Sequence, residues 1–316
     1  MAARRLACTE RAPTMDGSRP TIGFIGLGAI GSPMARRLID AGYELVVYDI
    51  SEPALGVFAG SARLARSARE VADGAQIVFV CLASLPAHDT VVLGADGIVA
   101  GGAARICVIT STTGPELVAR MQIGLAARGI ALVDAPMTGG RVRAAAGTLT
   151  VMLSGPEDAT AAVEPVLRCY AGRIVHFGEL AGRAQVMKLV NNVMSAVNFA
   201  IAAEALVFGS KAGLDPEAML DVINNGTGKN DASLTVIPQN VLTRRFDFGS
   251  PMAVILKDMG AAIAEADRLG VPVAMTRAVT AMFERAIANG VSAQADQTEL
   301  VRDLERSAGV EVERTR

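Results

Sequence analysis

The segment TIGFIGLGAIGSPMARRLIDAG, residues 21–42, decides how the chain folds. It opens with a short apolar run, passes through a G-x-G-x-x-G string and continues as an amphipathic stretch. A strand, a glycine turn and a helix in this order form the setting in which such a string binds dinucleotide phosphates. Gly26 allows the tight turn, Gly28 lets the backbone approach a pyrophosphate, and Gly31 allows close helix–strand packing. The free N–H groups at the helix N-terminus favour the anion.

Short apolar runs rich in β-branched residues recur along the following part of the chain. They span residues 21–26, 44–49, 76–82, 105–110 and 130–136, with amphipathic stretches between most of them. Strands that alternate with helices predict βαβ units and a parallel sheet buried on both faces. Two further strands are expected at 148–155 and 172–178, on either side of a helix over 156–169.

The strand signal ends after Gly182. Residues 184–212 have almost uninterrupted helical character up to Gly213. At 1.5 Å per residue this helix would be about 40 Å long, enough to bridge two domains. Further helices are expected over 215–225, 233–243, 251–268 and 272–289. The expected fold class is therefore α/β: a Rossmann-type N-terminal domain, then an all-α C-terminal domain, joined by a long interdomain helix.

These patterns also set the expected domain limits. Residues 1–19 lack apolar periodicity, contain Glu10 and Asp16, and have no apolar h-region, so we interpret them as a disordered arm and not a targeting segment. The nucleotide-binding domain is expected over 20–182 and the helical domain over 183–305. The end of the chain, 306–316, is expected to be a frayed tail.

Composition excludes several classes of protein. The 316 residues include 30 basic and 32 acidic side chains, so no global field favours nucleic acid or an anionic membrane. No apolar run is expected to reach the ~18–20 residues that a membrane span needs. The two histidines are far apart and the four cysteines contain no C-x-x-C pair, so neither a metal site nor a disulfide framework is expected. Free thiols favour the cytoplasm, with the mitochondrial matrix as the alternative.

An acidic residue follows the second predicted strand. Asp49 lies 18 residues after Gly31, where a carboxylate can accept a hydrogen bond from the adenosine ribose 2′-OH. The same carboxylate would repel a 2′-phosphate. NAD is therefore favoured over NADP.

Four ordered blocks together resemble the β-hydroxyacid dehydrogenase family, the 3-hydroxyisobutyrate dehydrogenase-like enzymes. The blocks are GFIGLGAIGSPMARRL (23–38), DAPMTGG (134–140) with AGTLTVMLSG (146–155), GRAQVMKLVNN (182–192) and LKDMGAA (256–262). The resemblance covers about residues 21–300. It implies NAD(P)-dependent hydride transfer that interconverts a short 3-hydroxy acid and its semialdehyde.

The resemblance also implies roles for individual residues. Lys188 and Asn192 match the catalytic lysine and its asparagine partner, and Thr138-Gly139-Gly140 matches the segment that holds the substrate carboxylate. The positions that match cofactor contacts are Ala29, Ile30, Asp49, Leu82, Thr112 and Lys257. Four positions depart from the family pattern and leave the substrate open: Ala83, Ile109, Arg143 and Ala184.

The residue types suit this chemistry. Lys188 and Asn192 are spaced i, i+4, so their side chains share one face of the helix. An ammonium can protonate a developing alkoxide, and a neutral amine can accept the alcohol proton in the oxidative direction. The alternative for Lys188 is a solvated surface charge. The apolar neighbours Met187 and Leu189 favour the functional interpretation.

A polar loop over residues 225–231 lacks the spacing of a Walker site. We hypothesise that it caps the substrate pocket and that Lys229 or Asn230 reads the far end of the substrate. A plain helix-connecting loop is the alternative.

Two other functions remain open from the sequence: imine or other carbonyl reduction on the same scaffold, and a non-catalytic NAD-sensing protein. The apolar helical stretch 193–208 and the family resemblance predict a homodimer or homotetramer. The expected small-molecule partner is a hydroxy acid or aldehyde that carries a carboxylate.

Overall fold

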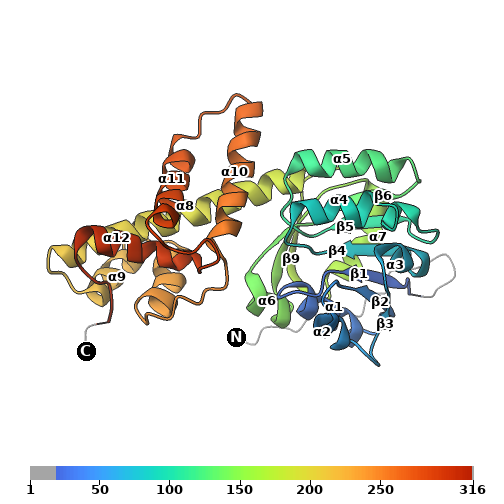
Figure 1. Ribbon diagram of the computed structural model, residues 1–316, viewed down its shortest axis with the longest axis horizontal. Coiled ribbons are helices and arrows are strands. Elements are labelled where there is room, and N and C mark those ends of the chain that lie inside the picture. Colours follow the sequence, from blue (N-terminus) through green and yellow to red (C-terminus); the bar gives the residue numbers. More distant parts are fainter. Residues whose placement is uncertain (1–18, 315–316) are drawn as a thin grey trace. The chain divides into compact units, whose positions relative to one another are not determined.

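The computed structural model describes residues 19–314, which form two compact units that divide between Lys188 and Leu189 (Figure 1). Residues 1–18 of the expected arm (1–19) lie outside the described residues, as do residues 315–316. Arg19, assigned to that arm, donates a hydrogen bond to the carbonyl of Ala41 and lies 5.1 Å from the ring centroid of Tyr43. Arg19 therefore already packs against the first unit.

The first unit is built on a six-stranded parallel sheet in the order β3-β2-β1-β4-β5-β6. Its strands are β1 (Ile22–Ile25), β2 (Leu45–Tyr48), β3 (Arg63–Leu64), β4 (Ile77–Val80), β5 (Ile106–Ile109) and β6 (Ala131–Asp134). This is the Rossmann order, whose chain reversal between β1 and β4 creates a ligand crevice at the carboxyl ends of the strands. The fold class predicted for this half is confirmed.

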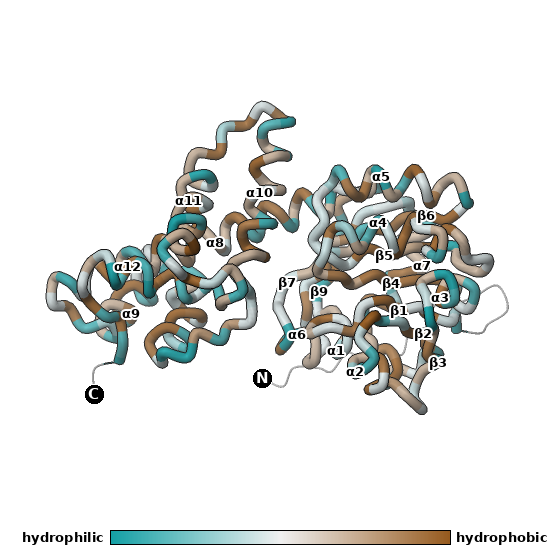
Figure 2. Tube along the Cα trace, viewed as in Figure 1, coloured by the Kyte–Doolittle hydropathy of each residue, from teal (hydrophilic) through white to brown (hydrophobic). Residues whose placement is uncertain are grey.

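Helices cover both faces of this sheet. They are α1 (Gly31–Asp40), α2 (Glu52–Gly56), α3 (Ala68–Gly74), α4 (Leu85–Leu93) and α5 (Pro115–Ala126), with a 3₁₀ turn η1 (Ile98–Ala100). In Figure 1, α4 and α5 lie on the side of the strands opposite to α1. Phe24 of β1 and Phe79 of β4 are fully buried, with stacked rings whose centroids are 5.9 Å apart. Burial on both faces explains why β1 and β4 contain no charged or polar side chain, and the brown colour of these central strands in Figure 2 shows the same.

A smaller three-stranded sheet completes the first unit. It contains β7 (Met137–Thr138), β8 (Leu149–Leu153) and β9 (Ala171–His176), in that order. The helices α6 (Gly140–Ala146) and α7 (Glu157–Leu167) come before and after β8. The two strands predicted near residues 148–155 and 172–178 are β8 and β9, which pair in parallel.

The second unit is helical. The long helix α8 (Arg183–Lys211) enters it, and the elements that follow are α9 (Pro216–Asn225), η2 (Ala232–Val241), α10 (Met252–Arg268), α11 (Ala274–Ala288), η3 (Gln297–Glu299) and α12 (Leu300–Ala308). The predicted helix over 233–243 is wound as a π-helix, with Leu242 N donating to Ile237 O at 3.0 Å. It contains Pro238, which has no N–H for an ordinary helical hydrogen bond.

Two predicted boundaries need correction. The compact units divide at 188/189, six residues beyond the predicted 182/183, because the first turns of α8 pack within the first unit. The expected frayed tail is wrong for residues 306–314: α12 continues to Ala308, and the Val312 side chain is fully buried. The backbone N–H of Val312 donates to Glu305 Oε1 at 2.7 Å. Residues 306–316 are mostly polar, so their sequence does not predict the burial of Val312.

By length and composition, α8 is apolar enough to cross a membrane, which corrects the expectation that no apolar run is long enough. Core helices of water-soluble proteins meet the same criterion. Part of α8 packs in the core of the second unit, where Phe199, Ala203 and Leu206 are almost fully buried. Its composition is therefore weak support for a membrane span.

Candidate active site

The glycine turn has the geometry expected of a phosphate cradle. Gly26 has a φ of +94°, and a Cβ there would lie 2.1 Å from the carbonyl oxygen of Cys81. A Cβ at Gly31 would lie 2.0 Å from the carbonyl oxygen of Gly26. At Gly28, by contrast, a Cβ would meet no described atom within 4 Å, so its backbone faces open space. No side chain caps the N-terminus of α1, which leaves its N–H groups available to a phosphate.

Asp49, directly after β2, reaches back to this turn. Its Oδ2 accepts a hydrogen bond from Leu27 N at 2.6 Å, and its Oδ1 accepts one from Ser51 N at 2.8 Å. The carboxylate is thus fixed beside the turn at the carboxyl end of β2. Ala29 is exposed in the turn and Ile30 is half-buried at the start of α1. These positions fit a dinucleotide whose pyrophosphate lies on the turn.

Two more predicted cofactor residues lie at the same edge of the sheet. A Cβ at Gly26 would lie 3.0 Å from Leu82 Cδ2, which places the Leu82 side chain against the glycine turn. The N–H of Leu82 donates to Ser111 Oγ at 2.7 Å and so ties the segment after β4 to the segment after β5. Thr112 follows in that second segment and is half-buried.

The predicted carboxylate-binding residues lie where β7 meets α6. Thr138 ends β7, and Gly139 and Gly140 have φ values of +129° and +66°, a conformation that favours glycine. A Cβ at Gly139 would lie 2.7 Å from Arg143 Cδ, so the stem of this arginine lies against the turn. The two glycines expose backbone N–H groups near a cationic side chain, which suits an anionic group.

Lys188 lies in the second turn of α8 and is half-buried. The beginning of that helix is held to the sheet edge by two fully buried side chains, Asp134 at the end of β6 and Gln185. Gln185 Nε2 donates to Asp134 Oδ1 at 2.7 Å, and Gln185 N donates to Asp134 Oδ2 at 2.9 Å. Burial raises the pKa of Asp134 to about 7, although its hydrogen bonds from Gln185, Gly182 and Ser154 lower it.

Asn192 and Lys257 belong to the second unit, where one carboxylate joins them. Asn192 Nδ2 donates to Asp258 Oδ2 at 2.6 Å, and Lys257 Nζ lies 3.0 Å from Asp258 Oδ1. Asp258 is 5% exposed. The Asn192 Oδ1 atom accepts from Asn191 Nδ2 at 3.2 Å, so the orientation of the Asn192 amide is fixed.

The two residues predicted in the polar loop before η2, Lys229 and Asn230, have different surroundings. Asn230 lies two residues before η2 and exchanges two hydrogen bonds with Ser233: its Oδ1 accepts from Ser233 N at 3.1 Å, and its N–H donates to Ser233 Oγ at 3.0 Å. This structural role occupies the Asn230 side chain. Lys229 is exposed and remains a candidate for substrate contact.

Sequence reasoning missed three residues that organise the site: Asp134, Gln185 and Asp258. Asp134 and Asp258 lie within the blocks DAPMTGG and LKDMGAA, but the family resemblance assigns roles only to neighbouring residues in these blocks. Gln185 had a signal that could have been used, since a glutamine within an apolar helix needs hydrogen-bond partners when it is buried.

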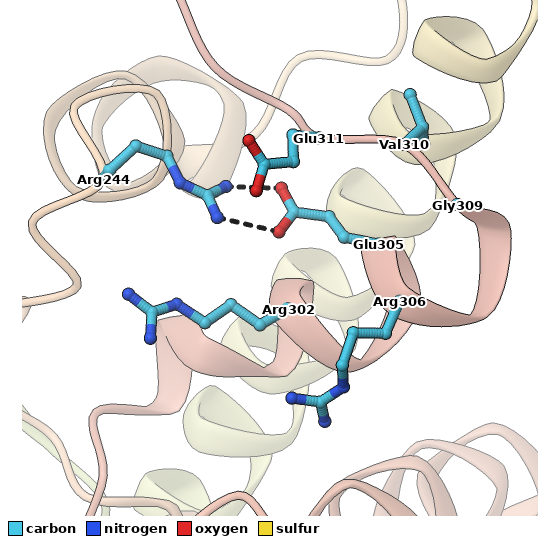
Figure 3. Close-up of a pocket in the computed structure, with 7 residues that line it drawn as sticks. All are labelled: Arg244, Arg302, Glu305, Arg306, Gly309, Val310 and Glu311. Atoms are coloured by element: carbon cyan, nitrogen blue, oxygen red, sulfur yellow. Dashed lines mark hydrogen bonds and ion pairs between the residues drawn. The ribbon is translucent and has the colours of Figure 1, made fainter.

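A cavity of about 540 Å³ lies elsewhere in the second unit, and no predicted site residue lines it (Figure 3). Arg244 and Glu305 face each other in it as a two-point ion pair, with Arg244 Nη2 donating to Glu305 Oε2 at 3.0 Å. Its lining comes from α12 and from the segments that follow η2 and α12, none of which carries a predicted site residue. Within residues 19–314, no group of three His, Cys, Asp or Glu side chains could hold a metal ion.

The first unit thus brings the glycine turn, Asp49, Leu82, Thr112 and the beginning of α8 to the carboxyl edge of one parallel sheet. Open space at Gly28 and an uncapped α1 fit a dinucleotide cofactor. Comparison with family models agrees: the NAD-binding domain of 6-phosphogluconate dehydrogenase matches residues 21–178. The NAD-binding domain of NADP-dependent 3-hydroxyisobutyrate dehydrogenase matches residues 182–304. The protein is an NAD(P)-dependent oxidoreductase that acts on CH–OH donors.

Individual relatives extend over nearly the whole chain. The 2-(hydroxymethyl)glutarate dehydrogenase of Eubacterium barkeri is 34% identical over 92% of this chain and 97% of its own length. The 3-hydroxyisobutyrate dehydrogenase of Pseudomonas aeruginosa is 36% identical over 78% of this chain and 85% of its own. The structure of Mycobacterium tuberculosis 3-hydroxyisobutyrate dehydrogenase with L-serine is 29% identical, with a TM-score of 0.80, and the match covers 90% and 99% of the two chains. The chain belongs to the β-hydroxyacid dehydrogenase family, as its sequence motifs predicted.

Proposed function

We propose that the protein interconverts a short 3-hydroxy acid and the corresponding semialdehyde, with Lys188 as the general acid/base. The observation that carries the proposal is the anchoring of the first turn of α8 at the sheet edge where the glycine turn lies. Lys188 follows the anchored Gln185 by three residues, so it begins one turn from that anchor. The relatives named above oxidise hydroxy acids according to their names, which supports the same substrate class here.

Each group in the first unit has a separate task. A bound nicotinamide dinucleotide supplies or accepts the hydride. As the carbinol is oxidised, Lys188 Nζ takes the hydroxyl proton, and in the reductive direction it returns a proton to the alkoxide oxygen. Thr138, Gly139 and Gly140 hold the substrate carboxylate through a hydroxyl and backbone N–H groups.

The residues of the second unit support the same reaction in this proposal. Asn192 holds an oxygen of the substrate or the lysine itself, with its amide oriented by Asp258. Lys257 contributes positive charge for the dinucleotide. Lys229 reads the far end of the substrate, and a Lys229→Ala variant with unchanged KM and kcat would remove this residue from the site.

We propose NAD as the preferred cofactor, on the position of Asp49. Its carboxylate is held beside the glycine turn by Leu27 N and Ser51 N, where it suits a free ribose 2′-OH and opposes a 2′-phosphate. Comparison of kcat/KM for NAD⁺ and NADP⁺ tests this directly. A ratio below one in the wild-type protein would overturn the NAD preference without affecting the role of Lys188.

We also propose a cytoplasmic homo-oligomer. In the second unit, α8 exposes Val190, Met194, Ile201 and Phe208, a set of large apolar side chains spaced by four or seven residues. Such spacing places them on one side of the helix, which suits association with another apolar surface. Sedimentation at micromolar concentration should give a dimer or tetramer, and a monomer would contradict this part.

The function itself is tested with a substrate panel. The purified protein is mixed with NAD⁺ or NADP⁺ and with short 3-hydroxy acids, 2-hydroxy acids and a cyclic amine, and the absorbance at about 340 nm is followed. Turnover confined to 3-hydroxy acids is expected. Oxidation of the amine alone would favour an imine reductase, and dinucleotide binding without any turnover would favour an NAD-sensing protein.

A further inference from the structure

The beginning of α8 receives its cap from other elements. Gly182 precedes the helix and has no side chain that could cap it. In its place, Asp134 Oδ2 accepts from Gly182 N at 3.2 Å and from Gln185 N at 2.9 Å. Ser154, just after β8, accepts from Ala184 N at 3.1 Å through its Oγ. The start of α8 is therefore specified by the ends of β6 and β8, and these contacts fix where the helix begins.

The Gln185 amide extends this cap to a third element. Its Nε2 donates to Asp134 Oδ1 at 2.7 Å and to Ser111 O at 2.9 Å. Its Oε1 accepts from Thr113 N at 2.8 Å and from Gly114 N at 3.1 Å. Both donors and both acceptor positions of the amide are thus in use, so the side chain has one orientation. The segment that contains Thr112 is held on both sides by this one glutamine.

A buried network in which every polar atom has a partner is sensitive to the loss of any member. Here the members join the segment around Thr112 to the helix that carries Lys188 one turn further on. We propose that Asp134 and Gln185 form a positioning pair that sets the first turn of α8, and with it Lys188, in register with the Thr112 segment. This inference rests on the proposed role of Lys188.

Neither member is a candidate for the chemistry itself. Both side chains are fully buried, and the acceptor atoms of Asp134 already receive hydrogen bonds from Gln185, Gly182 and Ser154. Their effect on the reaction must pass through the residues that they hold. A positioning role predicts a loss of kcat with little change in substrate KM, because none of their hydrogen bonds reaches the Thr138–Gly140 segment.

The pair allows a rescue experiment. Asp134→Asn places an NH₂ group against the donor Nε2 of Gln185, and Gln185→Glu places a carboxylate oxygen against Oδ1 of Asp134. We expect either single variant to lower kcat about 10- to 100-fold, with KM for the hydroxy acid changed less than threefold. The double variant restores a donor facing an acceptor and should recover at least half of the loss on a logarithmic scale. Recovery stays incomplete, because the carboxylate oxygen introduced by Gln185→Glu also faces Ser111 O, which has lost its donor.

Amide hydrogen exchange gives a readout independent of activity. Each single variant should lose protection at residues 112–114 and 183–186 together, and the double variant should regain it. If Asp134→Asn does not fold, Ser154→Ala takes its place. This variant removes only the acceptor of Ala184 N and the hydrogen bond to Asp134, so it should lose protection at the same residues to a smaller extent. Asp303→Asn is the matched control: this carboxylate is 1% exposed but lies in α12, so kcat should stay within twofold of wild type.

Wild-type kcat in both single variants, or no recovery in the double variant, would overturn the positioning role. The parallel Lys188→Ala variant separates this from a failure of the proposed function. If Lys188→Ala is inactive while Asp134→Asn and Gln185→Glu retain full kcat, the lysine assignment stands and the positioning pair falls. If Lys188→Ala is active, the proposed function itself is wrong.

Discussion

The amide of Asn192 donates a 2.6 Å hydrogen bond to the carboxylate of Asp258, and the same carboxylate lies 3.0 Å from the ammonium of Lys257. The buried carboxylate of Asp258 therefore links two side chains, Asn192 of α8 and Lys257 of α10. Asn192 is also the residue predicted to be the partner of Lys188. Asp258 orients the Asn192 amide and contacts Lys257, the lysine that the family resemblance assigns to the cofactor.

This link predicts a dual effect of Asp258→Asn. The substitution weakens the ion pair with Lys257 and removes one of the acceptors around Asn192, so kcat should fall about tenfold and KM for the dinucleotide should rise. Steady-state kinetics with saturating hydroxy acid measure both. The control is Asp267→Asn on the same helix, whose exposed ion pair with Arg277 should leave both parameters unchanged. Equal kinetics in the two variants would contradict the link.

Stability should depend on pH through Asp134. Burial raises the pKa of this carboxyl from 3.8 to about 7, so the folded protein binds its proton more tightly than the unfolded chain does. The stabilisation is present in full below about pH 4 and is lost as pH rises through 7, by an amount of the order of 4 kcal/mol. Urea unfolding of wild type and Asp134→Asn at pH 5, 6, 7 and 8 measures it. The difference in unfolding free energy between the two should change over this range and then level off; a constant difference would contradict the shift.

The ion pair of Arg244 with Glu305 should stabilise the second unit. Burial lowers the pKa of Arg244, but the hydrogen bonds and the charge of Glu305 outweigh this and raise it. Glu305 is 5% exposed and also accepts from Val312 N, so it holds the chain beyond α12. Arg244→Met leaves a buried charge without its partner and should cost about 3 kcal/mol in urea unfolding.

A surface pair provides the comparison for that experiment. Arg245 and Asp247 form an exposed ion pair in the adjoining segment. Arg245→Met should therefore change the unfolding free energy by less than about 1 kcal/mol. If Arg244→Met and Arg245→Met lowered the unfolding free energy by similar amounts, the buried ion pair would stabilise the protein no more than the exposed one.

The sequence was sufficient for elements whose residues carry their own periodic signal. Runs such as 76–82 predicted the central strands, and the apolar stretch 184–212 predicted α8 to within a residue at each end. Strand β3 was not predicted, because its two residues, Arg63 and Leu64, are exposed and too few to form a pattern. The helix α12 was not predicted either, because its many polar residues are also typical of a loose chain terminus.

Contacts between distant residues were beyond this kind of prediction. Asp134 and Gln185 are 51 residues apart, and no local pattern encodes their pairing. Asn192 and Asp258 are 66 apart. Lys188 itself was identified through the family resemblance, whereas Gly26, Gly31 and Asp49 followed from the spacing of the glycine turn alone. Turn geometry is local, but hydrogen-bond networks depend on the completed fold.

The central claim is that the amine of Lys188 moves the proton of the reaction. The most direct measurement is kcat of Lys188→Ala beside Lys211→Ala, an exposed lysine at the end of the same helix, with dinucleotide affinity followed by NADH fluorescence. The account predicts that Lys188→Ala loses about 10²–10⁴ in kcat while its dinucleotide Kd stays within a few-fold of wild type, and that Lys211→Ala is unchanged. A Lys188→Ala protein that turns over a 3-hydroxy acid at the wild-type rate would contradict it.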